Sequence, residues 1–376
     1  MAGGAAAFRI WLLAGAAALA GCAGGPPTSP QYSAADARAI IDESLPRGLS
    51  DRSGWLNDIY AAFTVLTVQP SRENVCAVVA VIQQESSFQV DPVIPGLGDI
   101  ARREIDSRAE RAHVPLMIVR GLLGRKSSDG RSYGERIDRA KTEKDLSDIY
   151  EDFISSVPMG QSLFDDKNPI RTRGPMQVNV VFANEFAAAA PYPYPVKRSI
   201  ADEVFTRRGS IYFGLAHLLD YRAPYDDYVF RFADYNAGQY ASRNAAFQHA
   251  VTVASGIPLD SDGALLPTAD GAGGPGATEL AVRALGTRLS LSEASIHAAL
   301  LSAKQRSFEQ STLYQRVFEA ADKAAGAPLP RALLPNIHLQ GPKLKRHLTT
   351  QWYARRVDQR FHNCLKQQAS GQSTRP

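Results

Sequence analysis

Apolar residues recur at helical spacing along most of this sequence, and the alternating pattern of half-buried strands is scarce. A helix that covers a core needs an apolar residue every three or four positions, so this spacing predicts a mainly α-helical fold. A Gly-, Asp- and Pro-rich stretch at 255–276 interrupts the pattern and indicates a loop or hinge. Helices are expected at 34–43, 54–66, 72–87, 100–123, 144–155, 180–189, 210–221, 227–234, 277–286, 292–306 and 311–325.

Residues 1–21 have the features of an export signal. Arg9 precedes an apolar run at 10–19 that is too short to span a membrane permanently, and small residues follow it. Cys22 comes directly after Leu-Ala-Gly, which resembles the lipobox of bacterial lipoproteins. The resemblance implies cleavage before Cys22, acylation of that cysteine and a stable anchor in the outer membrane, facing the periplasm. An ordinary signal peptide followed by a chance cysteine is the alternative.

Two cysteines remain once Cys22 is lipidated, namely Cys76 and Cys364. An exported protein meets an oxidising compartment, so an even pair predicts a disulfide, with two buried free thiols as the alternative. The disulfide would tie the C-terminal end of the chain to the segment just before Glu85. Residues 22–33, rich in Gly, Pro and Ser, are expected to form a flexible tether.

The charge of the chain is modest and evenly distributed. Its 42 Lys and Arg residues nearly balance 38 Asp and Glu residues, and the net charge of +4 is not gathered in blocks. Nucleic-acid binding is therefore not indicated. The sequence contains neither CxxC nor HExxH, and its seven histidines are scattered, so we predict no metal site and no cofactor.

Glu85 is the first candidate for chemistry. It follows Ile82 by three positions and Val78 by seven, so on a helix it lies at the edge of an apolar stripe. Burial disfavours a charged carboxylate and raises its pKa, which suits a general acid at neutral pH. A solvated charge at a helix end is the alternative.

Three later segments bear on this choice. Residues 173–178 read Arg-Gly-Pro-Met-Gln-Val, residues 210–214 read Ser-Ile-Tyr-Phe-Gly, and residues 232–238 read Phe-Ala-Asp-Tyr-Asn-Ala-Gly. Each alone is compatible with a turn, a packed helix or a helix end. Together with Glu85-Ser86, and in this order, they resemble the lytic transglycosylase and goose-type lysozyme superfamily. The motifs of that superfamily are Glu-Ser, Gly-Leu-Met-Gln, Asn-Ile-x-x-Gly and Ala-Tyr-Asn-Ala-Gly.

The resemblance implies a lysozyme-like helical catalytic domain at 34–254 and assigns roles residue by residue. Glu85 matches the catalytic glutamate, and Tyr235 matches the tyrosine whose hydroxyl lies near the catalytic carboxyl. Substrate contacts are implied for Ser86, Met176, Gln177, Tyr235 and Asn236. The implied partner is peptidoglycan, cleaved between N-acetylmuramic acid and N-acetylglucosamine.

The sequence departs from the superfamily pattern at several positions. Pro175 replaces the usual leucine, Ser210 replaces the usual asparagine, and Asp234 is inserted before the last Tyr-Asn-Ala-Gly. The segment 93–170 also separates the glutamate from Met-Gln by far more than is usual. We expect it to be a helical insertion that acts as a lid, a wall-binding element or a surface for a protein partner. Residues 277–376 are expected to form a further helical region packed on the catalytic domain.

The implied mechanism uses one glutamate as acid and then as base, and closes a 1,6-anhydro ring on the muramic acid without water. Hydrolysis by a muramidase is an alternative, because a second carboxylate facing Glu85 across the groove would serve a water. Asp234 and Asp91 are the candidates for that second carboxylate. A lipoprotein that keeps the fold but binds glycan or a partner without cleaving it is the third interpretation.

Overall fold

The computed structural model describes residues 32–159, 168–190, 192–268, 271, 274–339 and 347–372. The predicted export signal, Cys22 and nearly all of the tether lie outside these residues. The described chain is mainly helical, as the apolar spacing predicted, and its strands are four two-residue segments in two hairpins. No helix in the described ranges is long and apolar enough to cross a membrane. The buried side chains of the described residues gather in three separate cores.

The central core surrounds α3, which is buried at every position from Val75 to Ile82. A helix that is apolar on all sides must be covered all round, and α18, α1 and α11 pack beside it in this core. The helices of the central core are α1 (Ala34–Ser44), α2 (Arg52–Val65), α3 (Arg72–Glu85), α9 (Val180–Ala189), α10 (Ile200–Glu203), α11 (Arg207–Leu219), α12 (Tyr228–Ala237) and α18 (Thr350–Gln372).

A disulfide joins α3 to α18 within this core. The sulfur atoms of Cys76 and Cys364 lie 1.97 Å apart, and their Cα atoms are 5.6 Å apart. The bond spans 288 positions of sequence, and it fastens α18 along the helix that ends at Glu85. The predicted pairing of these two cysteines is therefore the one present in the structure.

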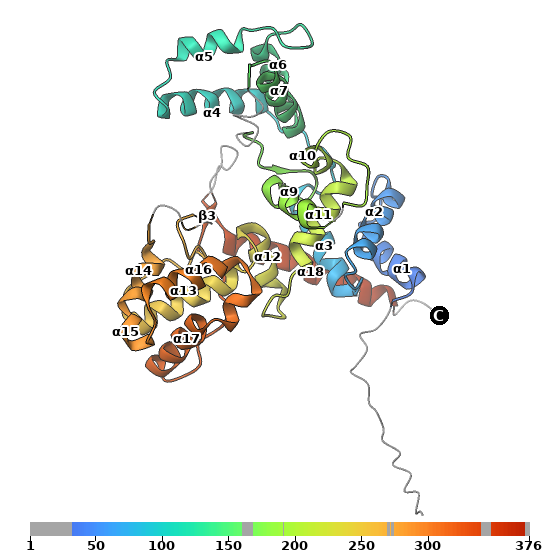
Figure 1. Ribbon diagram of the computed structural model, residues 1–376. Coiled ribbons are helices and arrows are strands. Elements are labelled where there is room, and N and C mark those ends of the chain that lie inside the picture. The colour runs from blue at the N-terminus through green and yellow to red at the C-terminus, as the bar shows by residue number, and fades with distance from the viewer. Residues whose placement is uncertain are drawn as a thin grey trace, which may run out of the picture.

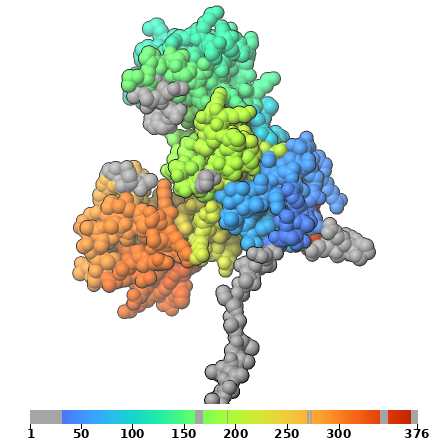
Figure 2. Space-filling view, turned by 45° about the vertical axis from the view of Figure 1, so that its right-hand side comes forward, coloured from blue at the N-terminus to red at the C-terminus, as the bar shows by residue number. Residues whose placement is uncertain are grey.

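The insertion, residues 93–170, forms a lobe with a small core of its own around Tyr133, Ile137 and Ile149. It projects from one end of the molecule (Figures 1 and 2). The stretch predicted as one helix at 100–123 is two helices, because the chain turns at 112–115 and Pro115 starts a new one. The helices of the insertion are α4 (Leu97–Arg111), α5 (Leu116–Leu123), α6 (Tyr133–Arg139) and α7 (Glu143–Ser155).

A second lobe forms around α13, whose Phe247, Ala250 and Val251 are fully buried. It appears in yellow and orange beside the central core (Figure 1). Its elements are α13 (Ala241–Ser255), α14 (Ala277–Ala284), α15 (Gly286–Leu289), α16 (Glu293–Leu301), the 3₁₀ turns η2 (Ser302–Lys304) and η3 (Arg306–Gln310), and α17 (Thr312–Ala325). The region expected at 277–376 is thus divided: α14–α17 belong to this lobe, whereas α18 belongs to the central core.

Two antiparallel hairpins complete the described fold. β1 (Thr172–Arg173) pairs with β2 (Val178–Asn179), with Arg173 opposite Val178. The segment Gly-Pro-Met-Gln is therefore the four-residue loop of this hairpin. β3 (His338–Leu339) pairs with β4 (Leu348–Thr349), directly before α18.

Candidate active site

Four of the residues singled out in the sequence line one large cleft. It has a volume of about 1500 Å³ and runs between the central core and the second lobe. Glu85, Gln177, Tyr235 and Asn236 all contribute to its wall, although they come from three distant segments of sequence. The structure therefore brings the first, second and fourth motifs together around one cleft.

Glu85 is the last residue of α3, and its side chain is only partly reached by solvent. Burial raises the pKa of its carboxyl to about 7, and the negative charge of Glu143 acts in the same direction. The hydroxyl of Tyr353 and the charge of Arg360 oppose the rise in pKa. Near neutral pH this carboxyl therefore exists in both protonation states, as an acid that must later act as a base requires.

Tyr353 comes from α18 and was not predicted as a site residue. No described residue meets its buried hydroxyl with the distance and angles of a hydrogen bond. The hydroxyl is nevertheless close enough to the Glu85 carboxyl to stabilise its charged form. Burial, followed by the charge of Glu85, raises the pKa of Tyr353 well above the usual range of tyrosine, so Tyr353 is a neutral donor. In the sequence it stands in a basic, aromatic tail that was expected to pack on the catalytic domain, but nothing in the tail indicated a position beside Glu85.

Tyr235 lies near the end of α12, and its hydroxyl donates a hydrogen bond to the carbonyl oxygen of Met176 at 2.7 Å. Burial, and then the charge of Glu85, raise the pKa of Tyr235 well above the usual range. The ring thus lies within the electrostatic reach of Glu85, but its proton is directed at the hairpin loop. Tyr235 connects the fourth motif to the second and helps to fix the cleft wall.

The second and third motifs pack against each other beneath the cleft. The Met176 amide donates to the Ser210 hydroxyl at 3.0 Å, so the serine that replaces the usual asparagine holds the hairpin loop. A Cβ on Gly214 would lie 2.5 Å from the Met176 sulfur, so only glycine at this position leaves room for the Met176 side chain. Gly174 has a φ of +72°, and a Cβ there would lie 2.1 Å from the Val204 carbonyl oxygen. Met176 is fully buried and supports the wall rather than lining it.

Gln177 is held from two sides. Its amide group donates to the Glu143 carboxylate at 3.0 Å, and its carbonyl oxygen accepts from the Thr172 hydroxyl at 2.8 Å. Glu143 is the first residue of α7, so the insertion contributes to the immediate surroundings of the candidate site. The sequence gave no signal for Glu143, since an acid in the first turn of a helix is ordinarily explained by the helix dipole.

The other two predicted contacts differ from each other. Asn236 lines the cleft and accepts a hydrogen bond from the Thr350 hydroxyl at 2.7 Å. Ser86 is buried, donates to the Ile82 carbonyl oxygen of its own helix at 3.1 Å, and is not part of the cleft lining. A direct substrate contact by Ser86 stays a prediction that this geometry does not favour.

Neither acid considered as the second carboxylate lines the cleft. Asp234 is buried, and its carboxylate accepts from the Tyr221 hydroxyl at 2.9 Å and from the backbone amides of Tyr240 and Ser242. It therefore organises the turn between α12 and α13. Asp91 is exposed, and its hydroxyl partner is Thr142. The carboxylate whose charge acts on Glu85 is that of Glu143, which corrects the expectation from sequence.

His217 is a further cleft residue that the sequence did not reveal. Burial lowers its pKa to about 4, so the ring is neutral. Nε2 lies 3.3 Å from the Tyr235 carbonyl oxygen, whereas Nδ1 is buried without a hydrogen-bond partner among the described residues. The Phe182 ring, also in the cleft wall, lies 4.4 Å from the His217 ring. The two rings meet edge to face at 60° and form an aromatic part of the cleft wall.

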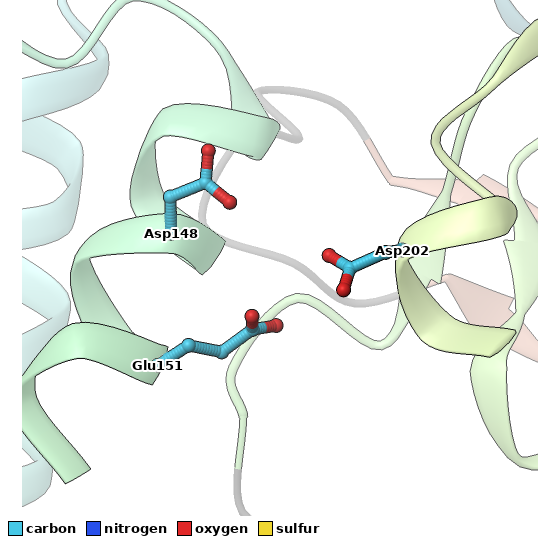
Figure 3. Close-up of side chains that lie close together, drawn as sticks. All are labelled: Asp148, Glu151 and Asp202. Atoms are coloured by element: carbon cyan, nitrogen blue, oxygen red, sulfur yellow. The ribbon is translucent and has the colours of Figure 1, made fainter. Parts of the chain in front are cut away.

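Three carboxylates outside the cleft lie close enough together to be considered as metal ligands. Asp148 and Glu151 of α7 face Asp202 of α10 (Figure 3), with oxygens within 4.8 Å of one another. Arg198 forms ion pairs with all three, and the buried Arg173 lies 3.5 Å from Glu151. Because the arginines already balance these charges, we interpret the group as an ion-pair network that holds the insertion against the central core.

Comparison with known proteins places the chain in a family without assigning it an activity. Residues 48–367 match the family model described as "Protein of unknown function (DUF1615)". The chain is 46% identical to the uncharacterized protein YaiW of Escherichia coli (strain K12) over 351 residues, which cover 93% of this chain and 95% of that protein. No solved structure is significantly similar to it. The chain therefore belongs to the DUF1615 family.

Proposed function

We propose that this protein cleaves the glycan strands of peptidoglycan as a lytic transglycosylase with a lysozyme-like catalytic domain, and that Glu85 is its single acid and base. The observation that carries the proposal is a carboxyl with a pKa of about 7 in a large cleft. Gln177, Tyr235 and Asn236, the residues that the motif resemblance selects, line the same cleft.

The proposed reaction starts with protonated Glu85. Its proton passes to the oxygen between N-acetylmuramic acid and N-acetylglucosamine, and the bond from C1 of the muramic acid to that oxygen breaks. The Glu85 carboxylate then takes the proton of the muramic acid 6-hydroxyl, whose oxygen bonds to C1. Glu85 ends protonated, so no cofactor is consumed. Tyr353 stabilises the carboxylate between the two steps, and Phe182 and His217 supply the sugar-binding surface.

Hydrolysis is the second candidate function, and one observation favours it. Glu143 lies near enough for its charge to raise the pKa of Glu85. Glu143 does not itself line the cleft, but its carboxylate is held by the cleft residue Gln177. A water that reaches it from the cleft would lose its proton there and attack C1, while Glu85 protonates the leaving oxygen. The insertion would then supply part of the catalytic machinery.

The proposed setting is the periplasmic face of the outer membrane. Lipid on Cys22 would hold the chain beside peptidoglycan, and residues 22–33 would limit its reach. The proposed substrate and the proposed location agree with each other.

Purified peptidoglycan sacculi test the proposal. The wild-type chain is expected to release soluble glycan fragments, and Glu85→Gln is expected to release about a thousandfold less or none. Glu319→Gln is the matched control, because Glu319 is an exposed glutamate on α17 that does not line the cleft. Its release is expected to stay within twofold of wild type. Equal release by wild type and Glu85→Gln would exclude Glu85 as the catalytic group and favour a binding protein.

A further inference from the structure

Helix α5 of the insertion buries none of its residues. Its sequence, Leu-Met-Ile-Val-Arg-Gly-Leu-Leu, is apolar at all but two positions. The exposed fractions of the large apolar side chains on it and just before it are 38% for Val114, 46% for Leu116, 82% for Met117, 53% for Ile118 and 40% for Leu122.

This surface differs from the rest of the described chain. The remaining large apolar side chains that are exposed are spread over separate elements, which is normal for a folded protein. Five of them within nine residues form a contiguous patch, and such patches mark interaction sites. Only Leu123 at the end of α5 packs against the core of the insertion, so the patch makes no contribution to that core.

The Lys, Arg, Asp and Glu residues within the segment that carries the patch are all basic. From 111 to 128 the chain has no Asp or Glu, but it has four basic residues: Arg111, Arg120, Arg125 and Lys126. Arg120 is paired with Asp106 at 2.7 Å, and Arg111 lies 3.6 Å from Glu104. Arg125 and Lys126 form no ion pair with any other described residue. The surface therefore favours a partner that is apolar and that carries negative charge opposite Arg125 and Lys126.

We propose that α5 and the adjoining basic residues insert into the surface of an anionic phospholipid membrane. Exposed apolar area and nearby arginine and lysine side chains both strengthen binding to the surface of a membrane that contains anionic lipids. The long basic side chains beside α5 reach the lipid phosphates while the apolar residues of α5 enter the acyl boundary. α5 lies at the opposite end of the molecule from α1, the first helix after the tether (Figure 1). This membrane contact is thus separate from the proposed anchor at Cys22, and it does not depend on the proposed activity.

A local probe tests the proposal in the full chain, whether or not a lipid already anchors it. Met117→Cys provides a thiol for an environment-sensitive NBD fluorophore, since Cys76 and Cys364 are joined in a disulfide. The wild-type chain taken through the same labelling corrects for any reaction at Cys22. Val181→Cys is the matched control, an exposed apolar position on α9.

The labelled chains are compared in vesicles of phosphatidylcholine alone and of phosphatidylcholine with phosphatidylglycerol. We expect the emission of the probe at 117 to shift to the blue only in the anionic vesicles, and the probe at 181 to show no shift. Adding Arg125→Gln and Lys126→Gln, or Ile118→Asp, is expected to remove most of the shift. α5 has no buried residue, so the helical circular dichroism spectrum should stay unchanged in these variants.

Two results would overturn the proposal. One is an emission at 117 that is the same in both kinds of vesicle and in buffer. The other is a blue shift in neutral vesicles that grows with protein density, which would identify a second copy of the chain as the partner of α5.

Discussion

Replacing Glu85 by glutamine should stabilise the protein at alkaline pH. Burial raises the pKa of Glu85 from its ordinary value of 4.5 to about 7. One pKa unit corresponds to about 1.4 kcal/mol, so the ionised carboxylate costs the folded state at most ~3.5 kcal/mol. Because part of the side chain is reached by solvent, we expect about 2 kcal/mol.

The sign of this effect fixes its pH window. A carboxyl whose pKa is raised in the folded state does not change the free energy of unfolding below about pH 4.5. It lowers the free energy of unfolding as the pH rises from there to about 7. The difference in free energy of unfolding between Glu85→Gln and wild type should therefore grow by about 2 kcal/mol between pH 4 and pH 8.5.

Urea denaturation at a series of pH values, with the disulfide intact, measures this difference. Glu185→Gln is the control, because Glu185 is exposed to solvent, and its difference from wild type should stay constant. A constant difference for Glu85→Gln as well would refute the inference that the cleft holds a buried carboxyl of raised pKa.

Three further predictions concern the surroundings of the site. Glu143→Gln can still accept the hydrogen bond from Gln177, but it removes a negative charge that raises the pKa of Glu85. The activity of this variant should therefore decline at a lower pH than that of wild type. A pH–rate profile identical to that of wild type would argue against this coupling. Replacing both Cys76 and Cys364 by alanine should lower the free energy of unfolding by about 3–5 kcal/mol, because their bond spans 288 positions; an unchanged denaturation midpoint would contradict this. Gly214→Ala should destabilise the protein by about 1–2 kcal/mol, because a buried methionine side chain occupies the space of the new methyl group; thermal unfolding of the variant checks it.

The fold class was predictable because most helices present an apolar stripe to one of the three cores. Helix α9 has the predicted bounds, and α3 was predicted within two residues. Helix α13 was not predicted, although it is the centre of the second lobe. Its Ser242, Arg243, Asn244 and Gln248 are all buried, so polar and apolar positions do not alternate with the helical period. Long-range hydrogen bonds, such as that of Arg243 to the carbonyl oxygen of Gln305 at 3.0 Å, satisfy these side chains.

The candidate site was predictable where one motif carried both the position and the chemistry. Glu85, Gln177 and Tyr235 belong to such motifs, and they line one cleft. Glu143 and Tyr353 do not, because their neighbours in sequence say nothing about Glu85. Glu143 is brought to the site by the ion-pair network of α7, and Tyr353 by the disulfide and the packing of α18 on α3. The positions of Glu143 and Tyr353 near Glu85 therefore follow from tertiary packing, which the local sequence does not reveal.

Mass spectrometry of the fragments that the wild-type chain releases from purified peptidoglycan tests the central proposal most directly. If Glu85 acts alone as acid and base, the new muramic acid ends are 1,6-anhydro rings, lighter by one water than reducing ends, and Glu85→Gln yields none. Reducing ends would contradict the transglycosylase mechanism and identify a hydrolase, and the absence of fragments from the wild-type chain would contradict the proposal that this protein is an enzyme of the cell wall.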